Sequence, residues 1–243
     1  MKKKIILITG SSSGIGFGLA KKFLEAGNEI IICSNNSKKL KKASIKLKNC
    51  KYFKIDLSKE LSIKKSIKKF KKRFKKIDTL ICNYGDSNFK KNNSDFNYAF
   101  NNNFFSTTNT IKYLLPLLKN NSSKIICISS ICGIEFIKNA PIGYSIAKSA
   151  LNNYVKMISF ELAKKNILIN SIALGNILFK GSTWDKKLKK NQIKINKYIH
   201  ENVPLKKFGS ISEVFNLCNY LSSNQNFSTG STYVLDGGQT KKF

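Results

Sequence analysis

Tyr144 and Lys148 are the two residues of this chain whose types and spacing are best suited to acid–base chemistry. The spacing Tyr-x-x-x-Lys places both side chains on one face of a helix, one turn apart. A cation this close favours the phenolate, and so lowers the pKa of a tyrosine from its reference value of about 10. Most such pairs lie on solvated helix surfaces, so the pair indicates a site only together with other features.

A glycine-rich segment near the N-terminus, residues 9–16 with the sequence T-G-S-S-S-G-I-G, provides the second feature. It follows an apolar run and opens an amphipathic one. Small residues let the backbone approach a pyrophosphate, and a helix N-terminus offers unpaired N–H groups and a positive dipole. Such a turn can be no more than a tight turn, but its place directly after a strand favours a dinucleotide site. With Tyr144 and Lys148, it indicates redox chemistry on a carbonyl or an alcohol.

Short apolar runs alternate with longer amphipathic ones along the chain, the pattern of a parallel sheet covered by helices. The predicted strands are residues 4–9, 29–33, 51–55, 77–82, 124–129, 167–172 and 231–236. The predicted helices are residues 14–26, 37–47, 59–75, 95–119, 143–164, 184–198 and 211–222. Pro116 should kink or end its helix. No linker or repeat divides residues 1–243, so we expect one doubly wound α/β domain with a seven-stranded parallel sheet and a ligand crevice at the carboxyl ends of its strands.

The composition is strongly basic, with 44 lysines and arginines against 13 acids and a formal net charge of +31. Such an excess can mark a partner that is nucleic acid or another anion. The lysines are spread over nearly every predicted helix, however, and isoleucine and asparagine are abundant, as in a chain from an A+T-rich genome. We therefore expect no specific nucleic-acid partner. No run approaches the roughly 18 to 20 apolar residues that cross a bilayer, and we expect no membrane association and a cytoplasmic location.

Cysteine and histidine usage argues against a metal site or a disulfide framework. The six cysteines are Cys33, Cys50, Cys82, Cys127, Cys132 and Cys218, and they include no C-x-x-C pair. Thiols in apolar strands behave as small hydrophobic side chains. His200 is the only histidine, so a Ser-His-Asp hydrolase is excluded unless His200 itself serves.

The spacing T-G-x-x-x-G-x-G, together with Y-x-x-x-K, resembles the short-chain dehydrogenase/reductase family, and the resemblance extends over nearly the whole chain. Other segments that resemble family motifs are Asp56-Leu57, Asn83-Tyr84-Gly85, Asn103, Ser129-Ser130-x-x-Gly133, Val203-Pro204-Leu205, Phe208-Gly209, Glu213 and Asp236-Gly237-Gly238. The resemblance implies a Rossmann-type fold and an NAD(P)-dependent enzyme that interconverts a carbonyl and a secondary alcohol.

Four catalytic residues follow from this resemblance. Tyr144 would exchange a proton with the substrate oxygen, and Ser130 would hydrogen-bond the same oxygen. Lys148 would hold the hydroxyls of the nicotinamide ribose and lower the pKa of the tyrosine. Asn103 would orient a water that connects Lys148 to solvent.

The resemblance also implies the residues that bind the cofactor. They are Thr9, Gly10, Ser12, Ser13, Gly14, Ile15, Gly16, Ser34, Asn35, Asp56, Leu57, Asn83, Gly85, Tyr144, Lys148, Gly175 and Ile177. NAD-selective members usually carry an acid at the end of the second strand. Cys33-Ser34-Asn35-Asn36 has none, and Lys38 and Lys39 follow. This favours NADPH over NADH.

The chain departs from the family pattern in three places. Leu174 stands where proline usually precedes Gly175, and this change could loosen the turn beside the nicotinamide. Cys82 and Tyr84 replace an asparagine and an alanine of the N-N-A-G motif. Ser130 lies one residue farther from Tyr144 than is usual, so Ser129 is an alternative to it. None of these changes removes a catalytic side chain.

The substrate depends on residues 176–203, which correspond to the family's variable substrate lid. This segment holds Trp184, which could line an acyl or sugar pocket or anchor the lid, and it is rich in lysine. A basic lid suits an anionic substrate, and Lys165 resembles a basic residue of 3-oxoacyl-carrier-protein reductases. We therefore expect a small-molecule or carrier-linked carbonyl substrate, first a 3-oxoacyl thioester. A reductase of keto-sugar or polysaccharide precursors is the alternative, and a catalytically silent nucleotide-binding regulator is the alternative of another class.

We also expect a homodimer or homotetramer. The resemblance is the main ground for this expectation. In addition, helices 95–119 and 143–164 carry more apolar residues than one sheet-facing stripe needs, among them Phe100, Phe104, Leu151 and Met157.

Overall fold

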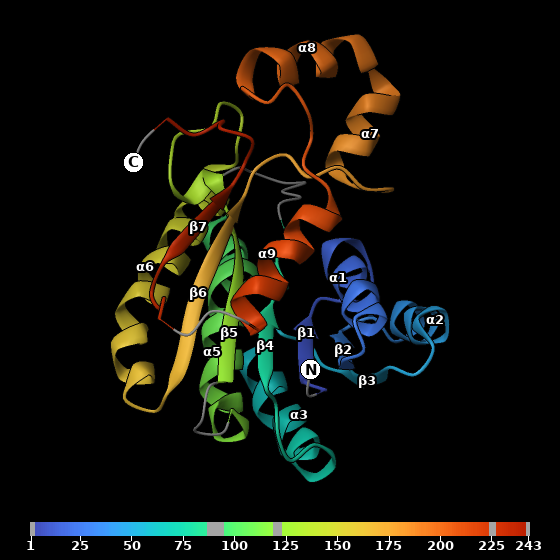
Figure 1. The fold of residues 1–243 in the computed structure, drawn as a ribbon, viewed down its shortest axis with the longest axis vertical. Coiled ribbons are helices and arrows are strands. Elements are labelled where there is room, and N and C mark those ends of the chain that lie inside the picture. The colour runs from blue at the N-terminus through green and yellow to red at the C-terminus, as the bar shows by residue number, and fades with distance from the viewer. Residues whose placement is uncertain (1–2, 87–94, 119–122, 224–226, 242–243) are drawn as a thin grey trace.

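The computed structural model describes residues 3–86, 95–118, 123–223 and 227–241. Seven parallel strands form one sheet in the order β3-β2-β1-β4-β5-β6-β7 (Figure 1). Their bounds are β1 (Ile5–Thr9), β2 (Glu29–Ser34), β3 (Lys51–Lys54), β4 (Thr79–Cys82), β5 (Ser123–Ser130), β6 (Ile167–Leu174) and β7 (Thr232–Leu235). The predicted doubly wound sheet is confirmed, and each predicted strand is present with ends that differ by at most two residues.

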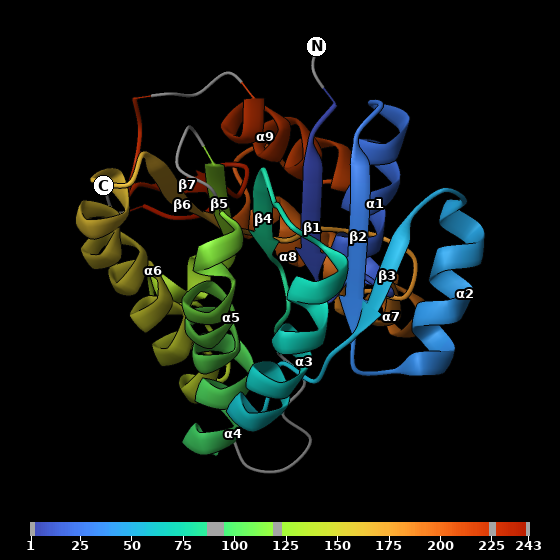
Figure 2. The ribbon, with the colours of Figure 1, turned by 90° about the horizontal axis from the view of Figure 1, so that it is seen from below.

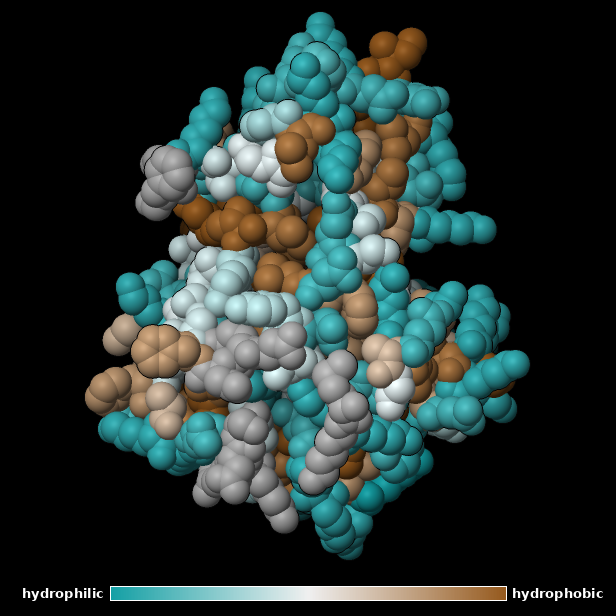
Figure 3. All heavy atoms as spheres, in the orientation of Figure 1, coloured by the Kyte–Doolittle hydropathy of each residue, from teal (hydrophilic) through white to brown (hydrophobic). Residues whose placement is uncertain are grey.

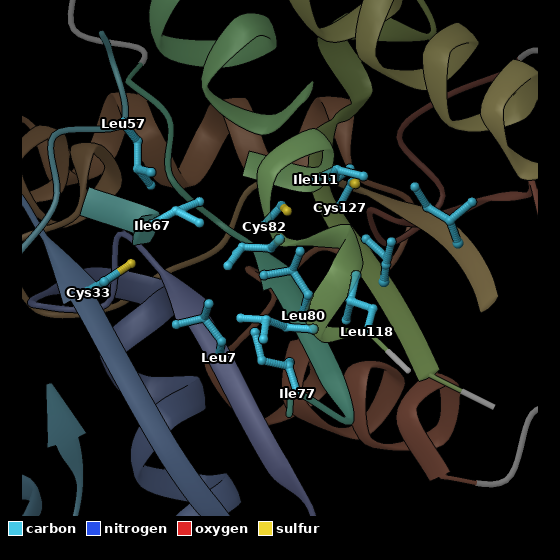
Figure 4. Packing of buried hydrophobic residues seen from close by; sticks show 14 of the residues in the cluster. Leu7, Cys33, Leu57, Ile67, Ile77, Leu80, Cys82, Ile111, Leu118 and Cys127 are labelled. Carbon is cyan, nitrogen blue, oxygen red and sulfur yellow. The ribbon is translucent and has the colours of Figure 1, made fainter. Parts of the chain in front are cut away.

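The strands form because their apolar residues are buried on both faces of the sheet. Alternate side chains point to opposite faces, so Leu7 enters one core while Ile6 and Ile8 enter the other. Figure 4 shows Leu7 and Leu80 from adjacent strands in the first core, with the thiols of Cys82 and Cys127 beside them. The three cysteines that lie in strands, Cys33, Cys82 and Cys127, are thus packing residues of this core.

Helices cover both faces of the sheet (Figure 2). Leucine, isoleucine and phenylalanine side chains of α3 (Glu60–Arg73), α5 (Ser106–Leu114) and α6 (Ile142–Ala163) pack into the first core. Residues of α1 (Gly14–Glu25), α2 (Ser37–Leu47) and α9 (Ile211–Ser223) pack into the second. No helix in the described part of the chain is both long and apolar enough to cross a membrane.

The predicted helix over residues 95–119 is present as one helical run from Phe96 to Leu117, but it is not a regular α-helix throughout. The described part contains α4 (Phe96–Phe100), a π-helical turn (Asn101–Phe105), α5 and a 3-10 turn (Leu115–Leu117) at the predicted Pro116; residue 119 lies outside the described residues. In the π-turn, Asn102 and Asn103 donate their side-chain amides to the carbonyls of the residues four positions earlier. Side chains that bond to the backbone in this way stabilise a departure from the regular helix.

The predicted helix over residues 184–198 is divided in two. It consists of α7 (Thr183–Lys190) and α8 (Gln192–Asn202), which lie beyond the carboxyl ends of the strands, at the top of Figure 1. Asn191 separates them because its side chain caps α8, accepting a hydrogen bond from Lys194 N at 2.9 Å. An asparagine that caps the next helix ends the previous one.

Candidate active site

The carboxyl ends of the strands open into a cleft of about 1810 Å³. All four predicted catalytic residues, Asn103, Ser130, Tyr144 and Lys148, line it. The predicted cofactor residues that also line it are Gly10, Ser12, Ser13, Gly14, Ile15, Ser34, Asn35, Asn83, Gly85, Gly175 and Ile177. Thr9, Gly16, Asp56 and Leu57 lie outside the lining. The structure therefore brings together most of the residues that the sequence indicated.

The glycine-rich turn forms one end of the cleft. Gly10 and Gly14 both have φ of +63°, a conformation that side chains other than glycine rarely adopt. A Cβ on Gly16 would lie 2.5 Å from Asn83 Nδ2, so Gly16 serves close packing below the turn. Ser11 holds the turn to β2, because its hydroxyl donates to Ile8 O at 2.6 Å and accepts from Cys33 N at 3.0 Å.

This turn fits the pyrophosphate of a dinucleotide. Ser13 is the N-cap residue of α1, and in the described structure its side chain makes no capping hydrogen bond, while the first turn contains no acidic residue. The N–H groups at the start of α1 thus keep their capacity to bind an anion. A glycine cradle and an uncapped helix start are what a dinucleotide needs at this position.

Thr9 and Asn83 support the turn from beneath. Thr9 Oγ1 accepts hydrogen bonds from Asn83 N at 2.9 Å and Tyr84 N at 3.0 Å. The side-chain amide of Asn83 donates to Thr9 O at 3.0 Å and to Gly10 O at 3.3 Å. These bonds join the end of β1 to the end of β4. Because the Thr9 hydroxyl points toward the backbone at the end of β4, the buried threonine does not itself face the cleft.

Ser130, Tyr144 and Lys148 meet where β5 ends and α6 begins. A side-chain hydrogen bond joins Ser130 and Tyr144. Lys148 lies one helical turn after Tyr144, with its Nζ 5.8 Å from the centroid of the tyrosine ring, and donates to Ile128 O at 2.9 Å. Gly133 lets β5 and α6 approach this closely, since a Cβ there would lie 2.5 Å from the carbonyl carbon of Lys148.

Burial sets the protonation of both ionisable groups. Desolvation raises the pKa of Tyr144 above its ordinary value, and the hydrogen bond with Ser130 offsets only part of that rise. Desolvation lowers the pKa of Lys148 to about 8, with the thiol of Cys127 as the largest opposing influence. The predicted net lowering of the Tyr144 pKa is therefore wrong, because desolvation outweighs any stabilisation of the phenolate by Lys148. Tyr144 keeps its proton at neutral pH and can donate it.

Ser129, the alternative to Ser130, lies deeper. Its side chain is buried, and its hydroxyl oxygen has no hydrogen-bond partner among the described residues. The Ser130 hydroxyl, by contrast, contacts Tyr144 and accepts from Cys132 N at 3.2 Å. The geometry favours Ser130 as the residue that acts with Tyr144.

Asn103 is fully buried and fixes the loop that follows β4. Its Oδ1 accepts from Asp86 N at 3.0 Å, and its Nδ2 donates to Asp86 O at 2.9 Å and Ala99 O at 3.1 Å. A Cβ on Gly85 would lie 2.8 Å from Asn103 Oδ1 and 3.5 Å from Lys148 Nζ. Gly85 therefore packs between Asn103 and the ammonium group of Lys148. In this structure the Asn103 side chain hydrogen-bonds mainly to the backbone of the loop.

The end of the cleft beside β2 and β3 differs partly from expectation. Ser34 Oγ accepts from Ser12 Oγ at 3.0 Å, and Asn36 and Lys39 line the cleft next to it. Asp86 is the one carboxylate among the described lining residues, so no acid stands at the end of β2.

After β3, Ser58 and Lys59 line the cleft in place of Asp56 and Leu57. Leu57 is buried, and the carboxylate of Asp56 accepts from Ser58 Oγ at 2.7 Å. Asp56 was predicted from the family motif to bind the cofactor. In the folded loop its carboxylate instead accepts a hydrogen bond from Ser58, two residues later.

The turn after β6 keeps its shape although Leu174 replaces the usual proline. Gly175 N donates to Leu235 O at 2.9 Å, and a Cβ on Gly175 would lie 2.7 Å from Asp236 Cα. The side-chain amide of Asn176 donates to Gln239 Oε1 at 2.7 Å. These contacts with the C-terminal segment hold the turn, and sequence reasoning missed Asn176 and Gln239.

Residues 176–203 cover one side of the cleft. Trp184 stacks on Tyr198 with ring centroids 5.4 Å apart and contacts Phe208 at 5.6 Å, so it anchors α7 to α8 while also lining the cleft. Lysines line the same side: Lys180, Lys186, Lys187, Lys190 and Lys194. Figure 3 shows hydrophilic side chains over most of this part of the molecule. Lys165 follows α6 at the opposite, amino edge of the sheet and does not line the cleft.

Comparison with known proteins identifies the family. A family model described as enoyl-(acyl carrier protein) reductase matches residues 10–240. The curated 3-oxoacyl-[acyl-carrier-protein] reductase FabG of Rickettsia felis is 30% identical over 244 residues, covering 97% of this chain and 96% of the relative. The enzyme of the same name from Buchnera aphidicola subsp. Baizongia pistaciae is 34% identical over 248 residues, or 97% of each protein.

Solved structures agree with this identification. L-sorbose reductase from Gluconobacter frateurii, complexed with NADPH and L-sorbose, superposes with a TM-score of 0.89 at 25% identity, covering 100% of this chain and 98% of that one. RhlG of Pseudomonas aeruginosa, in an NADP complex, gives a TM-score of 0.87 at 26% identity, covering 97% and 95%. These relatives set aside the silent regulator. The chain belongs to the short-chain dehydrogenase/reductase family and is an NAD(P)-dependent carbonyl reductase.

Proposed function

We propose that this protein reduces a 3-oxoacyl thioester, carried by an acidic acyl carrier, with NADPH as the reductant. The observation that carries the chemistry is the meeting of Tyr144 with Ser130, one helical turn from Lys148, in a cleft that begins at a dinucleotide-type turn. The names of the curated relatives support the substrate class.

In this proposal a bound nicotinamide would supply the hydride that the carbonyl carbon of the substrate accepts, and the residues of the cleft would do the rest. Tyr144 donates its proton to the carbonyl oxygen, on which charge develops, and Ser130 hydrogen-bonds the same oxygen. Lys148 holds the ribose hydroxyls, and its charge stabilises the phenolate that Tyr144 leaves behind. Asn103 fixes Gly85 and Asp86 beside the lysine, and the water that it would orient remains part of the proposal.

The preference for NADPH is supported by the charges around Ser34. Among the described residues no carboxylate lies there to bind a free ribose 2′-hydroxyl or to repel a 2′-phosphate, whereas the Ser12 and Ser34 hydroxyls and the Lys39 ammonium line this end of the cleft. Of the predicted cofactor residues, Gly10, Gly14 and Ser13 would hold the pyrophosphate, and Thr9, Gly16 and Asn83 would support them.

Residues 176–203 are proposed as the substrate lid. The lysines on its cleft side suit a phosphopantetheine arm and an acidic carrier, because clustered positive charge attracts anionic partners. A keto-sugar substrate is the second candidate. It is favoured by the partly exposed ring of Trp184 at the cleft and by the likeness to L-sorbose reductase.

The test is NADPH oxidation with three substrates: an acetoacetyl group on a carrier protein, the same group on a small thiol, and a keto-sugar nucleotide. We expect the carrier-linked substrate to give the highest kcat/KM. Lys187→Glu with Lys190→Glu should raise the KM for that substrate and leave the small thioester unchanged. Lys65→Glu with Lys68→Glu, on α3 outside the cleft lining, is the matched control. Turnover of the keto sugar alone would replace the first candidate with the second.

A homodimer or homotetramer remains part of the proposal, with its contact residues revised. Leu151 is fully buried within the chain and Phe104 packs against its core, so neither is free to contact a second copy. Met157 and Phe160 on α6 are 75% and 68% exposed. Changing both to aspartate should shift the protein to a monomer in light scattering, while Ile193→Asp, at a lid residue that is 85% exposed, should not.

A cytoplasmic location without a specific nucleic-acid partner is also proposed. Lysines occur on α1, α2, α3, α7 and α8, on different sides of the sheet (Figure 1). Binding to random duplex DNA should be weak and lost at physiological salt, because it would depend on charge alone.

A further inference from the structure

Tyr84 occupies a position where the family pattern has alanine, and its side chain reaches the π-turn. The Tyr84 hydroxyl donates to Asn102 Oδ1 at 2.7 Å, and the half-buried ring packs against the first core while lining the cleft. Asn102 is 6% exposed, so the acceptor of this hydrogen bond is largely shielded from water. An alanine could not reach this partner.

The bond from Tyr84 lies next to the two bonds from Asn103 to Asp86. Residues 84–86 after β4 and residues 102–103 in the π-turn are therefore joined by three side-chain hydrogen bonds, of 2.7, 3.0 and 2.9 Å. The tyrosine thus connects the loop after β4 to the π-turn, two segments that both line the cleft.

The register between these segments decides where Asn103 lies. The hydrogen-bonded loop of a π-turn contains one residue more than that of an α-helix, and the surrounding structure must keep it from relaxing to the regular form. Relaxation would rotate Asn103 relative to Asp86 and move Gly85 away from Lys148 Nζ. The Tyr84 bond attaches the residue immediately before Asn103 and opposes that rotation.

We propose that Tyr84 is a positioning residue for carbonyl reduction, whose hydroxyl holds the π-turn in register against the loop after β4. It acts through Asn102 and Asn103 and does not touch the reacting atoms. This inference rests on the proposed function, because it concerns the place of Asn103 and Lys148 in that reaction.

The principal variant is Tyr84→Phe, which keeps the ring and removes the hydroxyl. We expect kcat for acetoacetyl thioester reduction to fall by roughly three- to tenfold, the range that one hydrogen bond of ordinary strength supports. The Kd for NADPH, from fluorescence titration, should change by less than about twofold on the same scale. Tyr113→Phe is the matched control, because it removes a tyrosine hydroxyl of α5 that bonds Glu60 away from the cleft.

Amide hydrogen exchange provides a readout that needs no turnover. In Tyr84→Phe, exchange should rise in residues 98–106 and stay unchanged in β5 and β6. If wild-type protein reduces no carbonyl substrate, the proposed function fails. The exchange experiment still tests whether the Tyr84 hydroxyl holds the π-turn against the loop after β4. Unchanged exchange in residues 98–106, or an unchanged kcat in an active enzyme, would overturn the inference.

The double variant Tyr84→Phe with Asn102→Leu tests whether the hydroxyl acts through Asn102. Asn102→Leu also removes the bond from Asn102 Nδ2 to Tyr98 O, so the double variant is compared with Asn102→Leu alone. Once the acceptor is gone, removing the Tyr84 hydroxyl should lower neither kcat nor thermal stability further. If Tyr84→Phe lowered kcat as much in the Asn102→Leu background as in wild type, the hydroxyl would act through another partner and the proposal would be wrong.

Discussion

Asn103 holds the main chain of Asp86 from both sides, accepting from its N–H at 3.0 Å and donating to its carbonyl at 2.9 Å. The fully buried side-chain amide thereby satisfies the backbone N–H and carbonyl of Asp86, which in a strand or helix would pair with other backbone groups. Gly85, between this pair and Lys148, leaves room for the lysine head and no room for a side chain. The position of Lys148 thus depends on a hydrogen-bonded loop as well as on its own helix.

Asn103→Ala should lower kcat by roughly 10- to 100-fold, because small displacements of positioned groups are costly in catalysis. The carbonyl and N–H of Asp86 would lose their partners, and the loop could move away from Lys148. Steady-state kinetics with saturating NADPH measures the change. Asn101→Ala, at the exposed neighbouring asparagine, should stay within about twofold of wild type; equal losses in both variants would contradict a specific role for Asn103.

Ser130→Ala should cost about 100- to 1000-fold in kcat, the range for removing one donor to a developing oxyanion. The hydroxyl that contacts Tyr144 would be lost while the strand remains. Ser129→Ala removes a buried hydroxyl that has no partner in the described structure, so its activity should be near that of wild type. If Ser129→Ala lost more kcat than Ser130→Ala, Ser129 would be the residue that hydrogen-bonds the substrate oxygen.

NADPH affinity should depend on pH through Lys148, whose pKa burial lowers to about 8. The ammonium is charged below that pH and neutral above it. The Kd should therefore be constant from about pH 6 to 7 and increase as the pH rises through about 8. Titrations between pH 6 and 9.5 measure this. Lys148→Met should bind NADPH more weakly, and its Kd should show no increase near pH 8. If the increase remained in that variant, another group would be the one that titrates.

Ser34→Asp should reverse the cofactor preference, since a carboxylate at the end of β2 binds a free ribose 2′-hydroxyl and repels a 2′-phosphate. Wild type should prefer NADPH over NADH in kcat/KM. The variant should prefer NADH, and Lys39→Ala should lose only part of the NADPH preference. A wild-type enzyme that prefers NADH would refute the proposed preference directly.

The sequence was most informative where a motif is contiguous and its geometry is local. The turn with Gly10 and Gly14 follows from strand–glycine–helix order, and the one-turn separation of Tyr144 and Lys148 follows from their spacing. The seven strands of one parallel sheet follow from apolar runs that alternate with helices. These features depend on short-range backbone geometry, which residue types dictate closely.

Features that depend on tertiary contacts were missed or predicted wrongly. The π-turn at Asn102 and Asn103 depends on partners supplied by residues 84–86, which are distant in sequence. The direction of the Tyr144 pKa shift depends on desolvation, which no spacing reveals. The break at Asn191 had a local signal in its capping asparagine, and the bond between Asn176 and Gln239 had none.

Tyr144→Phe tests the central claim most directly. The variant should bind NADPH with a Kd within about twofold of wild type, because the phenol serves proton transfer, yet lose at least 100-fold in kcat with an acetoacetyl thioester. The measurement is NADPH oxidation under saturating substrate, with the binding titration made on the same preparation. A variant that binds NADPH normally and turns over at close to the wild-type rate would contradict the account, because the proton donor would then be another group.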